Sequence, residues 1–457
     1  MTHHIRQQFL EVAYTGSTED GMALQGRLSG LYYDQLLPAI EKAFDRALPA
    51  DRLIVIDRLE IDAGTIAFDR LDKDFPETLL RELANIIHQK GYDRILSGTT
   101  ELHDGVAIKT IPEHLADVFI HFLKTGTLLW SFRLTDGKTL EDELMAVVRD
   151  WKNGPKARTI AQKIVLALAV TNAVKRLSNE FSVNFKKQLL RFLSAEIADA
   201  VDEIQKSRPE KGIDPDIEKP FTNHLFEIAF TYLAENKRPS ASGFESEFIG
   251  KPGKEPSLEE VISKRQNETE GLQIQEPSSE KPETINQSEI EAESFYIDNA
   301  GLILLHPFLP RYFETLGLVK DKKLISPDRA LNLLNYLATG NTSSPEYELV
   351  LPKILCGLPL FVSGESKKEI SENELQESLA LLNAVIRHWA ALRNTSVDGL
   401  REAFLQRPGK LSQKEDGDWL LQLESRTHDI LLGQLPWGFN RIQLPWMERM
   451  LWVEWSY

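Results

Sequence analysis

The sequence contains a single cysteine, Cys356, among its 457 residues. One cysteine excludes an internal disulfide and any zinc or iron–sulfur site that needs several cysteine ligands. Long apolar runs are also lacking: the longest, residues 164–170, has seven residues, whereas a bilayer span needs ~20. We therefore expect no membrane insertion.

Basic residues are too few for a nucleic-acid binder. The chain has 53 Lys and Arg against 69 Asp and Glu, and its formal net charge is −16. Phosphate contacts need clustered Lys and Arg, so we expect no nucleic acid among the partners.

The first residues also lack the basic-then-apolar layout of a secretory signal. We therefore expect the chain to be cytoplasmic at its synthesis.

Motifs that carry chemistry are lacking as well. The chain has no glycine-rich nucleotide loop, no His-Glu-x-x-His zinc pair and no Gly-x-Ser-x-Gly nucleophile elbow. Cys356 could act as a nucleophile with His388 or His428 as its base, but its apolar neighbours at helical spacing favour a packed core thiol. We therefore predict a noncatalytic protein without a cofactor.

Metal binding is not expected either. Four histidines are close in sequence, namely His88, His103, His114 and His121. Only the last two share a helical face, and their spacing of two turns, about 10 Å, is too long for one ion. Glu60 and Asp62 could share a cation on one strand face, although a solvated face explains them better.

Residues 239–294 separate two folded parts of the chain. Between 240 and 294 there are 13 Asp and Glu against 5 Lys and Arg, and four prolines interrupt the stretch. High net charge with low hydrophobicity predicts a disordered acidic linker. A charged helical arm at 258–275 is the alternative. If the linker is disordered, limited trypsin digestion should cut it first and release two stable fragments.

The part before the linker divides into a small α/β unit at 1–110 and a helical region at 111–238. In the first, alternating apolar residues predict strands at 5–14 and 53–62, and helical periodicity predicts helices at 21–48 and 74–89. In the second, one apolar stripe runs from residue 160 to 204. This stripe predicts two helices that meet near residues 179–184.

The part after the linker, 295–457, contains six of the eight tryptophans. Helices are expected at 328–338, 346–356, 372–393 and 397–406, and short strands at 419–424, 441–444 and 451–455. This pattern predicts a C-terminal α+β domain. The whole chain is therefore predicted to be α+β and predominantly helical.

The last tryptophans are candidate partner-binding residues, because one short segment cannot easily bury so many large aromatic rings. They are Trp437, Trp446, Trp452 and Trp455. On a strand, residues three apart face opposite sides, so Trp452 and Trp455 cannot both enter one core. We expect Trp455, which is nearer the free end, to face solvent.

Several segments resemble the tape measure proteins of contractile injection systems, which are phage-tail-like particles. In the C-terminal part these are NAGLILLHPFLPRYF at 299–313, PEYELVLPKILCGLPL at 345–360, WAALRNTSVDGLREAFLQR at 389–407 and ILLGQLPWG at 430–438. In the N-terminal part they are HIR at 4–6 and IDRLEIDAG at 56–64. The resemblance thus covers both ends and omits the linker.

This resemblance implies a structural protein that lies in the inner tube, or at its ends, and sets the tube's length. Its implied partners are inner tube, baseplate or cap proteins, and self-association is a further option. The alternative is an adaptor or chaperone that binds tube, baseplate or cargo proteins during assembly, with the acidic linker attracting basic partners.

Overall fold

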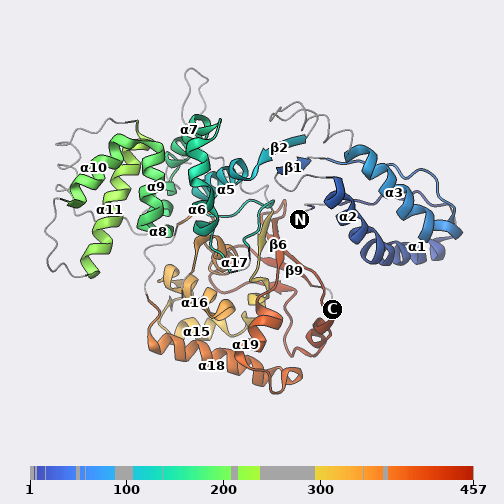
Figure 1. Ribbon diagram of the computed structural model, residues 1–457. Helices are drawn as coiled ribbons and strands as arrows, with labels where there is room; N and C mark the ends of the chain where they lie inside the picture. Colours follow the sequence, from blue (N-terminus) through green and yellow to red (C-terminus); the bar gives the residue numbers. More distant parts are fainter. Residues whose placement is uncertain are drawn as a thin grey trace, which may run out of the picture. The chain divides into compact units, whose positions relative to one another are not determined.

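The computed structural model describes residues 5, 8–15, 17–47, 52–56, 58–87, 106–135, 137–206, 215–236, 294–342, 344–363 and 369–455. These residues belong to two compact units, Met1–Asp117 and Val118–Tyr457, and helices outnumber strands in both (Figure 1). The predicted fold class, α+β and predominantly helical, is confirmed. The acidic linker predicted at 239–294 lies outside the described residues except for Ser294.

The first unit is a helical layer with a two-stranded ribbon. Its elements are α1 (Thr18–Leu31), the π-helical η1 (Tyr32–Leu36), α2 (Leu37–Ala47), β1 (Arg52–Ile56), η2 (Phe68–Arg70), α3 (Leu71–Ile87) and β2 (Val106–Thr110). β1 and β2 pair antiparallel, with Arg52 opposite Thr110. Leucines from α1 and Leu36 pack on Phe75, Leu79 and Leu83 of α3, at the helical spacing that the sequence predicted.

Of the two strands predicted in this unit, the first is wrong and the second is confirmed only over residues 53–56. Residues 8–15 are exposed and form no strand, and β1 ends at Ile56 rather than at residue 62. Beyond β1, Leu59 and Ile61 pack against the helical core. An alternating apolar pattern suits an extended chain that lies across helices as well as a paired strand, so the pattern alone did not show where pairing stops.

Within the second unit, residues 118–236 form a helical region. α5 (Ile111–Thr125) crosses from the first unit into this region, and five further helices precede the last one, α11 (Pro215–Ala234). These are α6 (Leu140–Asn153), α7 (Ala157–Leu168), α8 (Ala173–Glu180), α9 (Val183–Leu193) and α10 (Ala195–Lys206). Phe119, Phe181 and Phe185 meet in its core, with ring centroids 4.7–5.6 Å apart.

The apolar stripe at 160–204 forms four helices instead of the predicted two. The predicted break near 179–184 is present between α8 and α9, but the chain also breaks before α8 and before α10. Asn172, directly before α8, adopts the left-handed conformation, with φ at 71°, so the helix cannot continue through it. Ser182 caps α9 by accepting a hydrogen bond from the amide of Phe185 at 3.2 Å. Breaks set by single polar residues leave the apolar period intact, which explains why the stripe looked longer.

The C-terminal region, residues 294–455, contains a five-stranded sheet in the order β3-β6-β7-β9-β8. Its strands are β3 (Phe295–Ile297), β6 (Gly409–Gln413), β7 (Trp419–Leu423), β8 (Arg441–Ile442) and β9 (Leu451–Trp455). β7 and β9 run parallel and the other neighbours antiparallel. The strands predicted at 419–424 and 451–455 are confirmed, the one at 441–444 is shorter, and β3 and β6 were missed.

Helices pack around this sheet. They are η4 (Ala300–Leu305), α15 (Leu309–Thr315), α16 (Pro327–Thr339), η5 (Glu346–Glu348), α17 (Val350–Leu355), α18 (Glu372–His388), η6 (Ala390–Leu392), α19 (Val397–Leu400), the π-helical η7 (Arg401–Leu405) and η8 (Thr427–Gln434). A small ribbon joins β4 (Val319–Lys320) to β5 (Lys323–Leu324). The helix predicted at 372–393 ends earlier, at His388, and the next residue, Trp389, is buried in the core.

Candidate functional site

Trp437 and Trp446, which each follow a Leu-Pro pair, lie partly buried against the C-terminal core. The indole N–H of Trp437 donates to the carbonyl of Leu304 at 3.1 Å, and that of Trp446 to the carbonyl of Leu355 at 2.8 Å. Both polar groups are thus satisfied inside the chain. Only part of each ring is left for contact with another protein.

Trp452 lies on the opposite face of β9 from the core and is partly exposed. Its indole N–H donates to Asp418 at 3.0 Å, and this bond, with one from the Met450 amide, holds the pKa of Asp418 below its usual value. The Lys414 ammonium and the Arg441 guanidinium lie 4.9 and 5.7 Å from the ring centroid. An aromatic ring flanked by two cations is suited to binding an acidic or aromatic surface.

The expectation that Trp455 faces solvent is wrong, because this residue is only 3% exposed. The face of β9 that points to the core carries Leu451, Val453 and Trp455. The prediction that Trp452 and Trp455 face opposite sides is confirmed, but the sides were exchanged. The alternation with Leu451 and Val453 was visible in the sequence and outweighs proximity to the chain end.

A buried ion pair holds Trp455 in place. Its indole N–H donates to Asp429 at 2.9 Å, and the two terminal nitrogens of Arg407 donate to the same carboxylate at 2.6 and 2.9 Å. Burial tends to raise the pKa of Asp429, but the hydrogen bonds from Arg407 and Trp455 outweigh it and hold this pKa below its usual value. The last strand is therefore fixed by polar bonds as well as by packing.

The residues considered for chemistry have structural surroundings. Cys356 is buried in the C-terminal core, and this burial raises the pKa of its thiol, so little reactive thiolate forms. Glu60 and Asp62, expected on a strand, lie on exposed chain beyond β1. His88 and His103 lie outside the described residues. In the described part of the chain, no group of three or more His, Cys, Asp or Glu is placed to hold a metal ion.

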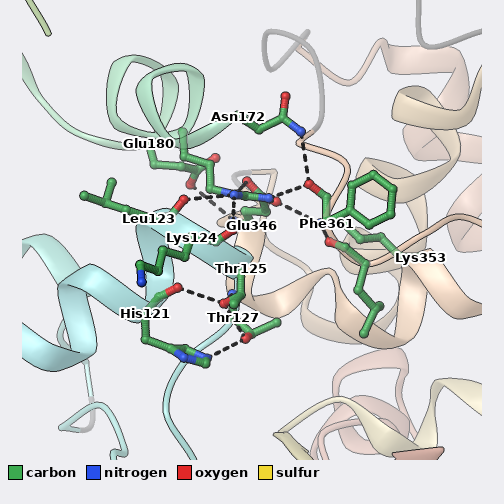
Figure 2. A network of polar contacts seen from close by, with 12 residues as sticks. His121, Leu123, Lys124, Thr125, Thr127, Asn172, Glu180, Glu346, Lys353 and Phe361 are labelled. Atoms are coloured by element: carbon green, nitrogen blue, oxygen red, sulfur yellow. Dashed lines mark hydrogen bonds and ion pairs between the residues drawn. The ribbon is translucent and has the colours of Figure 1, made fainter. Parts of the chain in front are cut away.

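A second buried ion cluster lies between the helical region and the C-terminal region. It consists of Arg176, Glu346 and Lys353, and we call it the junction cluster; Glu346 and Lys353 are labelled in Figure 2. The Arg176 Nε atom lies 3.1 Å from each carboxylate oxygen of Glu346, and the Lys353 Nζ atom lies 2.8 Å from one of them. The three side chains are 0, 3 and 3% exposed. Two cations thus share one carboxylate away from water.

Backbone carbonyls satisfy the remaining donors of the cluster. Arg176 donates to the carbonyls of Leu123 and Lys124, at the end of α5, at 2.9 and 3.0 Å, and to that of Phe361 at 2.6 Å. Lys353 donates to the carbonyl of Leu360 at 2.9 Å. One arginine of α8 therefore contacts α5, η5 and the segment after α17.

Burial and the neighbouring charges act in opposite directions on the ionisable groups of the cluster. Burial tends to raise the pKa of Glu346, but the neighbouring Arg176 and Lys353 charges lower it below its usual value. Burial lowers the pKa of Lys353, against the attraction of Glu346. Beside the cluster, His121 contacts the Thr127 hydroxyl at 3.0 Å, and burial together with the charges of Lys124 and Arg176 lowers its pKa to about 4.

Sequence reasoning did not select the junction cluster. The available signal was a charge at an otherwise apolar position: Arg176 precedes the buried Leu177 in the apolar stripe, and Glu346 and Lys353 lie in the apolar segment 345–360. Such charges are rarely buried unless they are paired. The pairing itself joins residues 170 positions apart, so no local pattern could identify it.

Comparison with known proteins adds to this geometry. The family model of the contractile injection system tape measure protein matches residues 2–455. The chain belongs to that family. The match includes both described units, so the resemblance of separate segments extends over nearly the whole tape measure sequence.

Other comparisons gave no relative of this tape measure family member. No curated protein and no solved structure matches the chain. None of the described helices is long and apolar enough to cross a membrane.

Proposed function

We propose that this chain is a noncatalytic structural protein of a contractile injection particle and that it sets the length of the particle's inner tube. The family match over residues 2–455 carries this proposal. The buried ionisable groups support it, because Asp429 and Glu346 are bonded to cations that hold the fold together. Cys356, the remaining candidate nucleophile, is packed in the core.

Length-setting requires a chain that can be extended. As one α-helix, 457 residues span about 690 Å, and fully extended they span about 1,500 Å. A compact domain of 160 residues is only about 40 Å across. The ruler function therefore implies either that folded parts open in the tube or that they lie at its ends as anchors.

Gene deletion followed by electron microscopy tests the proposal. Particles made without the chain should be absent or irregular in tube length, and a plasmid copy should restore one length. Particles of normal number and uniform length in the deletion strain would contradict a structural role.

An adaptor or chaperone is the second candidate, favoured by the compact packing of the C-terminal region around a buried apolar core. Unlike a tape measure, an adaptor or chaperone acts in its folded form and does not have to extend inside the tube. Mass spectrometry of purified mature particles separates the two functions, because a tape measure stays in the particle, whereas an assembly chaperone leaves.

We propose that Trp452 is the partner contact among the four tryptophans, together with the exposed ring surfaces of Trp437 and Trp446. Inner tube, baseplate and cap proteins are the proposed partners, at the lumen or the ends of the tube. Trp455 is unsuited to this contact because it is buried.

A further inference from the structure

The junction cluster joins two parts of the chain that are far apart in sequence. Arg176 belongs to the helical region, whereas Glu346, its ionic partner, and Lys353, the second cation on Glu346, belong to the C-terminal region. Between Asn236 and Ser294 lie 57 residues, which can span at most about 190 Å. The cluster is one of the contacts that hold the two regions together, and without such contacts this segment would let them lie up to that distance apart.

Contacts around the cluster converge on the same junction. The Glu346 amide donates to the carboxylate of Glu180 at 3.2 Å, and the Asn172 side chain donates to the Phe361 carbonyl at 3.2 Å (Figure 2). Phe122 of the helical region meets Tyr347 edge-on, with centroids 6.2 Å apart. All three contacts link residues of 118–236 to residues of 344–363.

Wholly buried charges make such a junction cooperative. Removing one partner leaves an uncompensated charge in the interior, which is strongly unfavourable, whereas full separation returns all the charges to water. Apolar residues of the same size would hold the regions together at least as firmly. A cluster of this kind thus favours two states, closed with every pair made or open with every charge hydrated.

We propose that the junction cluster is a releasable lock between residues 118–236 and 294–455. Closed, it holds the two regions as one compact body during synthesis. Open, it lets the chain lengthen without unfolding the C-terminal core. The lock is a property of the isolated chain, and only its use in the particle rests on the proposed length-setting function.

Hydrogen exchange on the full-length protein tests the lock. We compare the wild type with Glu346→Gln, which keeps the shape of the side chain and removes its charge. Exchange in peptides covering 172–180 and 344–349 should rise together by a factor of roughly 100 or more. Peptides of α16 should stay protected, and Cys356 should stay unreactive toward a thiol reagent.

Asp429→Asn is the matched control, because it removes a carboxylate that is as deeply buried but lies entirely within the C-terminal region. It should raise exchange in β9 and leave the junction peptides closed. Two results would overturn the lock: an increase on one side of the junction only, or loss of protection in α16 together with the junction in the Glu346→Gln protein.

An apolar replacement gives the second arm of the test. The triple variant Arg176→Met, Glu346→Leu, Lys353→Met should fold with junction peptides at least as protected as in the wild type. If the apolar variant opens as readily as the wild type, the charges are not what makes the junction releasable, and the proposal is wrong.

Discussion

Four side chains with almost no solvent exposure form two buried ion pairs, Arg176 with Glu346 and Arg407 with Asp429. The two pairs stabilise different parts of the molecule. The first joins two regions, and the second fixes the last strand through Trp455. Because a buried charge is stable only with its partner, single substitutions at these positions have specific and separable effects.

Trp455→Ala should lower the free energy of unfolding by about 3–5 kcal/mol, since it removes a buried ring and leaves Asp429 without one donor. Trp452→Ala, on the outer face of the same strand, should lower it by about 1 kcal/mol and weaken incorporation into particles. Urea denaturation and particle pull-down check both. Equal stability losses for the two variants would contradict the assignment of faces.

Gly126 lies directly against the junction cluster, and its φ of 78° by itself favours glycine. A Cβ atom there would lie 2.3 Å from a Glu346 carboxylate oxygen and 2.9 Å from Arg176 Nε. Gly126→Ala should therefore destabilise the protein by ~3 kcal/mol. Gly137→Ala is the control, because its φ is 75° and nothing lies within 4 Å of its Cβ position. Similar melting temperatures for the two variants would show that the cluster tolerates displacement.

At the scale of elements, the junction depends on where short helices end. The carbonyl groups of Leu123 and Lys124, at the end of α5, accept hydrogen bonds from the Arg176 guanidinium. Carbonyl groups in the last turn of a helix have no partner within that helix. The bend after α5 then brings Thr127 to His121. The end of α5 therefore supplies acceptors for a side chain from the face of α8.

Stability should fall as pH falls from 6.5 to about 4. Burial, Lys124 and Arg176 lower the pKa of His121 to about 4 in the folded protein. The unfolded chain thus binds the proton first, and unfolding becomes easier by on the order of 2 kcal/mol across this window. Glu346, whose folded pKa is also lowered, adds the same trend at lower pH.

Urea denaturation at several pH values measures this effect. The variant His121→Gln should be less sensitive to pH between 6.5 and 4, although its stability at pH 7 can differ from that of the wild type. An identical pH dependence in the variant would show that His121 does not titrate as its surroundings indicate.

At the scale of the whole molecule, the regions on both sides of residues 237–293 belong to one compact unit. The four-part division at 1–110, 111–238, 239–294 and 295–457 stays a proposal about the chain's organisation. If the junction cluster is closed, it alters the expected results of two experiments on the linker, proteolysis and deletion.

Trypsin should cut first in the acidic linker, after Lys251, Lys254, Lys264, Arg265 or Lys281, as the composition predicts. The two fragments should nevertheless elute together from a size-exclusion column, because the junction cluster holds them without the covalent link. The same digestion of the Glu346→Gln protein should give separate peaks. Separate peaks for the wild type would show that the junction is too weak to hold the nicked chain.

Deleting about 40 linker residues should shorten the particle's tube by at most ~130 Å, at ~3.3 Å per residue. This result is expected only if the junction cluster opens in the particle, since both linker ends otherwise stay on one body. The apolar triple variant is the internal control, because in that background the same deletion should leave tube length unchanged. Electron micrographs give the lengths.

The sequence by itself determined what depends on local pattern: the predominance of helix, the strands β7 and β9, the buried Cys356 and the family resemblance. Helical and strand periodicity are readable in one short segment because they record which side of that segment is buried. Only the tertiary structure decided that β3 pairs with β6 and that Arg176 meets Glu346. Both are contacts between residues far apart in the sequence. The sequence of one segment does not identify the distant residue that neutralises its charge or the distant strand that pairs with it.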